Sequence, residues 1–250
     1  MLITASEIIR QSTALYFNNW KKAAPFLLIS SGIVVLGALL SYIAIILEIR
    51  LGVPKILNDI VLVAVLVMGA IISFWSYLGL IKIFNNKLQN TNDVSFGIEM
   101  MSVKHLIWAG IYTSVMAGLI VALGFLLLVI PGIIFLVWYQ FSMSVLVVEE
   151  KKGVPALKAS KDLVTGRWFS VFWRIVGPTL FYVVIMGVIQ LIIERLIRLF
   201  TEAGAPDYLA ATSFVTNIIG IMFVPFMVGA ALILYQNLKN TPAPNGLTNK

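Results

Sequence analysis

Long stretches without a charged side chain constrain this chain more than any other feature of its sequence. Residues 26–47, 60–81 and 175–193 contain no Asp, Glu, Lys or Arg. Each stretch approaches or exceeds the ~20 residues that an α-helix needs to cross the hydrocarbon core of a bilayer. Only 12% of the 250 residues are charged and 60% are hydrophobic, whereas a soluble domain carries about 25% charged residues. The stretches predict an all-α membrane protein.

Two further apolar runs complete a prediction of six transmembrane helices. Residues 106–148 are all uncharged, and a single helix of that length would be about twice as long as the ~30 Å hydrocarbon layer is thick. The run must therefore fold back once. Pro131-Gly132 marks the turn, because proline lacks a backbone donor and glycine tolerates unusual dihedral angles. Residues 208–238 supply the last span.

These spans define one domain and its orientation. We expect residues 1–240 to form a single six-helix transmembrane domain and residues 241–250 to form a disordered cytoplasmic tail. Fourteen of the 18 Lys and Arg residues lie in the N-terminal arm, the second and fourth connections and the C-terminal tail. Because cytoplasmic loops are enriched in Lys and Arg, both termini are expected in the cytoplasm. The net charge of +7 follows from this topology, and nothing indicates nucleic-acid binding.

Two short phrases indicate an internal repeat. PALKASKDLVTGRW (residues 155–168) matches EIIRQSTALYFNNW (residues 7–20) at an offset of 148, with Ser12 on Ser160 and Trp20 on Trp168. The same offset places the first two spans on the last two. DVSFGIEMMSVKH (residues 93–105) precedes the middle two spans as a degraded third copy. The sequence therefore predicts three units, each a short cytoplasmic helix followed by a transmembrane hairpin.

The short helices are expected at Ala5–Asn18 and at residues 155–166, because both segments are amphipathic and too short to span a bilayer. One interpretation is a helix that lies in the membrane interface so that the chain can re-enter the bilayer. The other is a foot that binds anionic lipid or a partner protein. In the second case Lys158, Lys161 and Arg167 would contact lipid headgroups.

The segment LLVIPGIIFLVWYQFSMSVLVVEEKKGVPALKASKDLVTGRWFSVFWRIV (residues 127–176) resembles a known pattern. It is similar to YciC-like inner-membrane proteins of prokaryotes and to the membrane domain attached to some glycerophosphodiester phosphodiesterases. The residues that carry the resemblance are Pro131, Gly132, Trp138, Glu149, Gly153, Ala156, Leu157, Ser160, Gly166, Arg167 and Trp168. Where the pattern often has arginine in the fourth span, this chain has Gln140. The resemblance implies a polytopic fold in a prokaryotic inner membrane and no established activity.

Side chains in the pattern of a catalytic or metal site are missing from the sequence. His105 is the only histidine, and one histidine without a second ligand is a poor metal site. Glu149-Glu150 stands beside Lys151-Lys152, which is typical of a solvated charge run. The chain has no cysteine, so disulfides and thiolate chemistry are excluded. We therefore expect no cofactor, no metal and no enzymatic activity.

Neutral polar residues and small residues inside the spans are the remaining candidates. Gln140, Gln190 and Asn217 lie in the fourth, fifth and sixth spans. They could form interhelical hydrogen bonds of about 0.6 kcal/mol each. A stripe at four-residue spacing in the third span consists of Gly110, Ser114, Gly118 and Ala122. Such a stripe permits close approach of another helix, either within the chain or in a homo-oligomer.

Two classes of function follow. The first is a non-enzymatic scaffold or partner-binding bundle in the inner membrane. The alternative is a transporter or exporter of a small or lipidic solute, with a path between the repeats. A continuous polar cavity from Gln140 toward Gln190 or Asn217 would favour transport, whereas a tightly packed interior would favour the scaffold. Membrane lipids are expected partners in both cases, together with a membrane-protein partner or a second copy.

Overall fold

The structure, a computed structural model, describes residues 2–91, 95–200, 202 and 206–241. In this part of the chain six helical segments are long and apolar enough to cross a membrane. They are Trp20–Leu51, Lys55–Leu88, Lys104–Leu127, Val129–Glu149, Trp168–Ile197 and Tyr208–Asn240. The predicted all-α membrane fold is confirmed. The predicted tail lies outside the described residues from residue 242 onward.

The helices form three units of one short helix and one hairpin. The first unit consists of α1 (Ala5–Asn18), α2 (Trp20–Leu51) and α3 (Lys55–Leu88). The second consists of α4 (Phe96–Ser102), η1 (Lys104–Leu106), α5 (Ile107–Leu127), α6 (Val129–Tyr139) and α7 (Ser142–Glu149). The third consists of α8 (Val154–Val164), α9 (Trp168–Ile197) and α10 (Pro206–Asn240).

The turn of the middle hairpin differs from the prediction. The chain reverses at Leu128, which has extended backbone dihedrals, and Pro131-Gly132 lies in the first turns of α6. Proline is tolerated there because its missing N–H would have no helical acceptor. Gly132 serves close packing instead of a turn. A Cβ atom added at Gly124 of α5 would lie only 3.0 Å from the Gly132 Cα atom.

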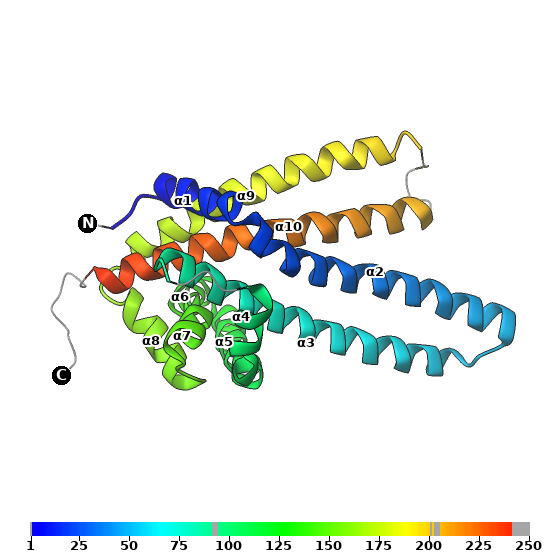
Figure 1. Cartoon of the computed structure of the whole chain (residues 1–250), viewed down its shortest axis with the longest axis horizontal. Helices are drawn as coiled ribbons and strands as arrows, with labels where there is room; N and C mark the ends of the chain where they lie inside the picture. Colours follow the sequence, from blue (N-terminus) through cyan, green and yellow to red (C-terminus); the bar gives the residue numbers. More distant parts are fainter. Residues whose placement is uncertain (1, 92–94, 201, 203–205, 242–250) are drawn as a thin grey trace.

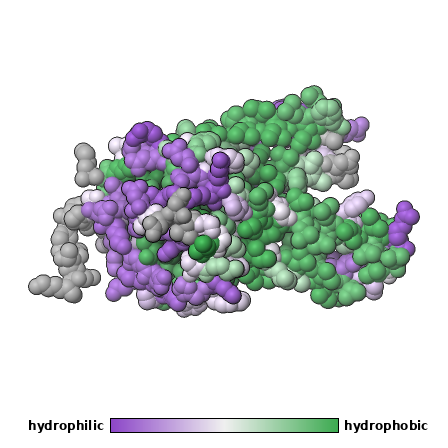
Figure 2. Space-filling model, in the orientation of Figure 1, coloured by the Kyte–Doolittle hydropathy of each residue, from purple (hydrophilic) through white to green (hydrophobic). Residues whose placement is uncertain are grey.

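Packing is concentrated at one end of the molecule, which we call the packed end and define by α1, α4 and α8. In Figure 1 the helices α2, α3, α9 and α10 run from this end along the long axis, whereas the α5–α6 hairpin is inclined steeply to them. Phe84, Phe141, Leu146 and Tyr235 are fully buried there. Hydrophilic residues gather over the packed end and apolar residues cover the hairpins that leave it (Figure 2). This distribution suits hairpins surrounded by lipid.

The three units are arranged in cyclic order. Helix α4 packs on α3, and α8 packs on α6 and α7, so each lies on the hairpin of the unit before it. Helix α1 of the first unit packs on α9 and α10, the hairpin of the third unit, which completes the cyclic order. The inner helices α3, α7 and α10 meet at the centre. Gln236 Nε2 of α10 donates to Asn85 Oδ1 of α3 at 3.1 Å, and the Tyr235 hydroxyl donates to Glu149 of α7 at 2.7 Å.

Local contacts in the first and third units correspond in detail. Asn19 Nδ2 donates to the Leu15 carbonyl and Arg167 Nε to the Leu163 carbonyl, each at 2.9 Å. These pairs occupy matching positions at the offset of 148 residues. Each short helix is followed by a long helix that begins at a tryptophan, Trp20 in α2 and Trp168 in α9. The apolar faces of both short helices are buried against neighbouring helices.

Candidate functional site

The fourth span is interrupted at its middle. Helix α6 ends at Tyr139 and α7 begins at Ser142. Gln140 keeps right-handed helical dihedrals, and the backbone departs from them at Phe141 (φ −95°, ψ 4°). An interrupted helix inside a membrane must satisfy the backbone groups that it frees. Ser160 of α8 does so from outside the span. Its hydroxyl donates to the Trp138 carbonyl at 2.6 Å and accepts from the Phe141 N–H at 3.1 Å. Because Ser160 is fully buried, the interruption is a supported feature of the fold.

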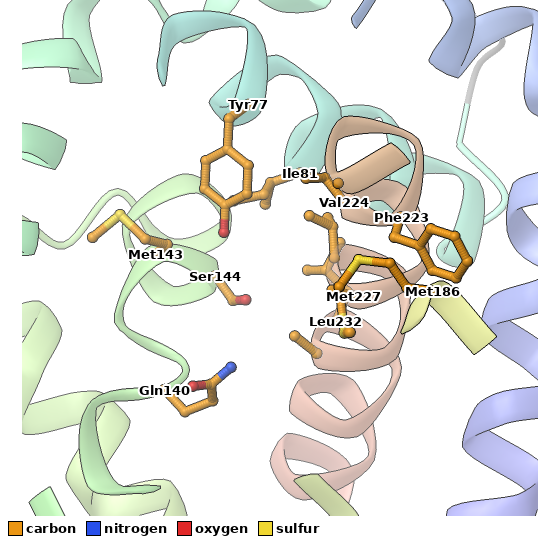
Figure 3. Close-up of a pocket in the computed structure, with 13 residues that line it drawn as sticks. Tyr77, Ile81, Gln140, Met143, Ser144, Met186, Phe223, Val224, Met227 and Leu232 are labelled. Atoms are coloured by element: carbon orange, nitrogen blue, oxygen red, sulfur yellow. The ribbon is translucent and has the colours of Figure 1, made fainter. Parts of the chain in front are cut away.

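A cavity of about 230 Å³ adjoins this interruption, and we call it the central cavity. It lies among α3, the α6–α7 junction, α9 and α10. Its lining consists of Tyr77, Ile81, Gln140, Met143, Ser144, Met186, Gly220, Phe223, Val224, Met227, Val228, Ala231 and Leu232. Figure 3 shows Tyr77, Ser144 and Gln140 on one side of the cavity and Met186, Met227 and Phe223 on the other. The central cavity therefore has a polar wall and an apolar wall.

The polar wall is not used by the protein itself. The Tyr77 hydroxyl, the Gln140 amide and the Ser144 hydroxyl form no hydrogen bond within the described part of the chain. The opposite wall contains flexible methionines, which adapt to ligands of different shape. All lining residues are uncharged. The cavity is therefore suited to a small uncharged molecule with an apolar body and at least one hydrogen-bonding group.

A smaller cavity of about 50 Å³ shares Gln140, Met227 and Ala231 with the central cavity. It extends toward Arg174 of α9. Pro178 has no N–H to donate to the carbonyl four residues earlier, so the Arg174 carbonyl lacks its helical partner. Polar groups thus continue from Gln140 toward the packed end.

A continuous polar cavity from Gln140 toward Gln190 or Asn217, which would favour transport over a scaffold, is not found among the described residues. Gln190 lines a different cavity of about 280 Å³ between α9 and α10, which shares no lining residue with the central cavity. Asn217 is exposed, and its amide donates to the Ser213 carbonyl of its own helix at 2.8 Å. Only Gln140 is brought to the central cavity. Sequence reasoning did not identify Tyr77, because a single tyrosine near the end of an apolar run has no distinguishing pattern.

The predicted packing stripe of α5 is correct for half of its length. Gly110 packs against Phe74, whose Cε1 atom would lie 2.9 Å from an added Cβ atom, and the Ser114 hydroxyl contacts Met143 Sδ at 3.6 Å. Gly118 and Ala122 are exposed, and no atom lies within 4 Å of a Cβ built at Gly118. The prediction of a packing face within the chain is wrong there. The reason is that α5 packs on α6 through Gly124, which lies outside the stripe. Whether Gly118 and Ala122 meet a second copy stays a prediction.

Of the three residues predicted to contact lipid headgroups, the two lysines lie at the surface and Arg167 is buried. Lys158 is exposed, and Lys161 Nζ lies 4.3 Å from the centre of the Trp138 ring. Arg167 is only 8% exposed. Its guanidinium donates to the carbonyls of Leu163, Leu238 and Thr241 at 2.9, 2.6 and 2.7 Å. Burial lowers the pKa of Arg167 below its usual value. The prediction of a headgroup contact is wrong for Arg167, which caps the C-terminal ends of α8 and α10 instead.

Charged residues near the centre of the packed end form structural contacts. Glu149 accepts from Tyr235 at 2.7 Å and pairs with Lys151 and Lys239 at 2.8 and 3.0 Å, which ties α7 to α10. His105 Nε2 lies 3.8 Å from Glu150, and both side chains are exposed. Among the described residues no three His, Asp or Glu side chains are grouped so that they could hold a metal ion.

Comparison of the chain with protein-family models, with curated proteins and with solved structures found no match in any of the three. The resemblance to YciC-like proteins stays a prediction.

Proposed function

We propose that this protein is a non-enzymatic membrane protein that binds a small uncharged or lipidic solute in the central cavity, as a transporter or exporter would, without a continuous polar path from this cavity to the one that contains Gln190. The observation that carries the proposal is the polar wall, where three side chains without hydrogen-bond partners in the described part of the chain lie beside a helix interruption. Transporters built from internal repeats commonly bind their solutes near the middle of the membrane, at interrupted helices between the repeats. Gln140 lies at such an interruption between α6 and α7, but the hydrogen bonds of Ser160 place this interruption at the packed end of the molecule.

The second candidate is a scaffold or partner-binding bundle, and one observation favours it. The central cavity and the cavity that contains Gln190 share no lining residue, and the packed end is filled by Phe84, Leu146 and Tyr235. A scaffold needs such packing and no continuous path. In that case the central cavity would be a packing defect that no solute enters.

A single introduced thiol distinguishes the two candidates. The chain has no cysteine, so Ser144→Cys would place the only thiol of the protein in the central cavity. We expect this variant to react with N-ethylmaleimide in intact membranes at least about ten-fold faster than Val145→Cys. Val145 is the matched control because it is the next residue of α7 and is fully buried. Equal reaction rates would mean that small solutes do not enter the central cavity, and would favour the scaffold.

We further propose that the protein lies in a prokaryotic inner membrane with both termini in the cytoplasm. The support is the basic composition of the connections on one side and the hydrophilic surface of the packed end (Figure 2). A reporter that is active only in the periplasm should give no signal when fused after Lys250. The same reporter inserted after Gly52, between α2 and α3, should be active. The reverse pattern would show that the orientation is inverted.

A further inference from the structure

An apolar groove of about 520 Å³ lies on the outside of the bundle, between α6 and the start of α9. Its walls include Ile130, Ile134 and Trp138 of α6, which are spaced four residues apart along one helix face, and Trp168, Phe169 and Phe172 of α9. The groove runs from the turn of the middle hairpin toward the packed end. Ile130 and Phe169 are 71% and 67% exposed, so the groove opens onto the apolar surface that faces lipid.

The two ends of this groove differ in charge. At the packed end Lys161 Nζ lies 4.3 Å from the centre of the Trp138 ring, a cation–π contact that holds the ammonium beside the groove. Within the described part of the chain no salt bridge to Lys161 is found. Trp168 stacks on Phe172 with ring centres 5.2 Å apart. At the other end, Ile130 stands among the apolar residues of the hairpin turn.

We propose that this groove binds one anionic phospholipid of the surrounding leaflet, with an acyl chain along α6 and the phosphate at Lys161. An apolar groove with a cation at one end matches such a lipid, which has apolar acyl chains and a negatively charged phosphate at one end. Tryptophan at that end suits the headgroup level, and the ammonium has no acidic partner that would compete with a phosphate. The site is separate from the central cavity, so it stands or falls independently of the proposed transport function.

Zwitterionic phospholipid is the nearest competing occupant, and charge distinguishes the two. Its choline ammonium would place a second positive charge close to Lys161, whereas phosphatidylglycerol brings only the phosphate. Apolar contact with the acyl chain is equal for the two lipids. Neither lysine lines the groove itself, but Lys161 lies over the ring of Trp138, which does. Selectivity for anionic lipid should therefore depend on Lys161, while Lys158, which is exposed on the same helix, should contribute little.

Native mass spectrometry of the full-length protein in detergent tests this proposal. The protein is titrated with phosphatidylglycerol and with phosphatidylcholine that carry the same acyl chains. We expect one tightly bound phosphatidylglycerol, an affinity for it that falls about five-fold in Lys161→Gln, and a change of less than about two-fold in Lys158→Gln. Melting temperatures of both variants should stay close to that of the wild type, because Lys158 is exposed and Lys161 loses only a half-buried cation–π contact with Trp138.

Three outcomes would overturn the proposal. The first is equal affinity of the wild-type protein for the two lipids. The second is an equal loss in Lys161→Gln and Lys158→Gln, which would indicate unspecific attraction of anionic lipid to the basic end. The third is a dimer that excludes bound lipid, which would mean that a second copy of the chain covers the groove.

Discussion

Replacing Arg167 with leucine is expected to destabilise the purified protein by about 3 kcal/mol, because the guanidinium satisfies three carbonyl groups that leucine cannot reach. The Leu238 carbonyl lies in the last turn of α10, and the Thr241 carbonyl belongs to the residue that follows this helix. The third, that of Leu163, belongs to the end of α8. Helix C-termini carry unsatisfied acceptors and a partial negative charge. One buried cation therefore joins two helix ends that are more than 70 residues apart in the sequence.

Thermal unfolding in detergent measures this effect. A loss of about 3 kcal/mol corresponds to a decrease of about 6–12 °C in melting temperature for a chain of this size. Arg167→Lys should recover only part of the stability, because an ammonium lacks the planar fork that reaches several carbonyls at once. Lys158→Leu is the matched control, since it removes one positive charge from the exposed face of the preceding helix α8 without breaking a hydrogen bond. If Arg167→Leu and Lys158→Leu behave alike, Arg167 faces solvent or lipid headgroups, as the sequence alone suggested.

The membrane fold could be predicted from the sequence because its main signal is local. An uncharged run of about 20 residues has few alternatives to a membrane span, and the repeat of Ser12 at Ser160 and Trp20 at Trp168 already indicated the matching units. The cyclic packing of the units could not be predicted. It depends on contacts such as those of α1 with α9 and α10, which join residues at opposite ends of the chain.

The candidate site could be predicted only in part, for a related reason. Gln140 was identified because an amide within an apolar run is unusual. The interruption of the helix beside Gln140 could not be predicted, because no proline or glycine occurs between Tyr139 and Ser142. The interruption depends on Ser160, which is supplied by another helix. Asn217 was placed in the interior by composition alone, yet its amide is satisfied by its own helix, and the side chain can therefore face outward.

Arg167 and Gly118 show the limit of residue-type arguments in membrane proteins. A basic residue near a predicted headgroup level was expected to contact lipid, but the C-terminal end of α10 lies close enough to bury it. A glycine at regular spacing was expected to permit close packing, but close packing occurs at Gly124 and Gly132, where the two helices of the middle hairpin converge. At both residues the prediction and the structure differ because tertiary packing decides the contacts, and the local sequence pattern does not contain that packing.

The most direct test of this account is to look for the proposed solute of the central cavity in the purified protein. Organic extracts of the wild-type protein, purified from its membrane, can be compared by untargeted mass spectrometry with extracts of Gln140→Leu and Gln190→Leu. The two substitutions make the same chemical change, and each preserves the approximate size of the side chain. They differ only in the cavity that loses an amide.

We expect one small compound to accompany the wild type and Gln190→Leu in similar amounts. Its amount should fall about ten-fold in Gln140→Leu, because loss of one hydrogen bond to the solute costs about 1.4 kcal/mol of binding free energy. Melting temperatures of the two variants equal to that of the wild type would show that all three proteins are folded. Wild-type protein that carries no such compound, or a compound retained equally by Gln140→Leu and Gln190→Leu, would contradict solute binding in the central cavity.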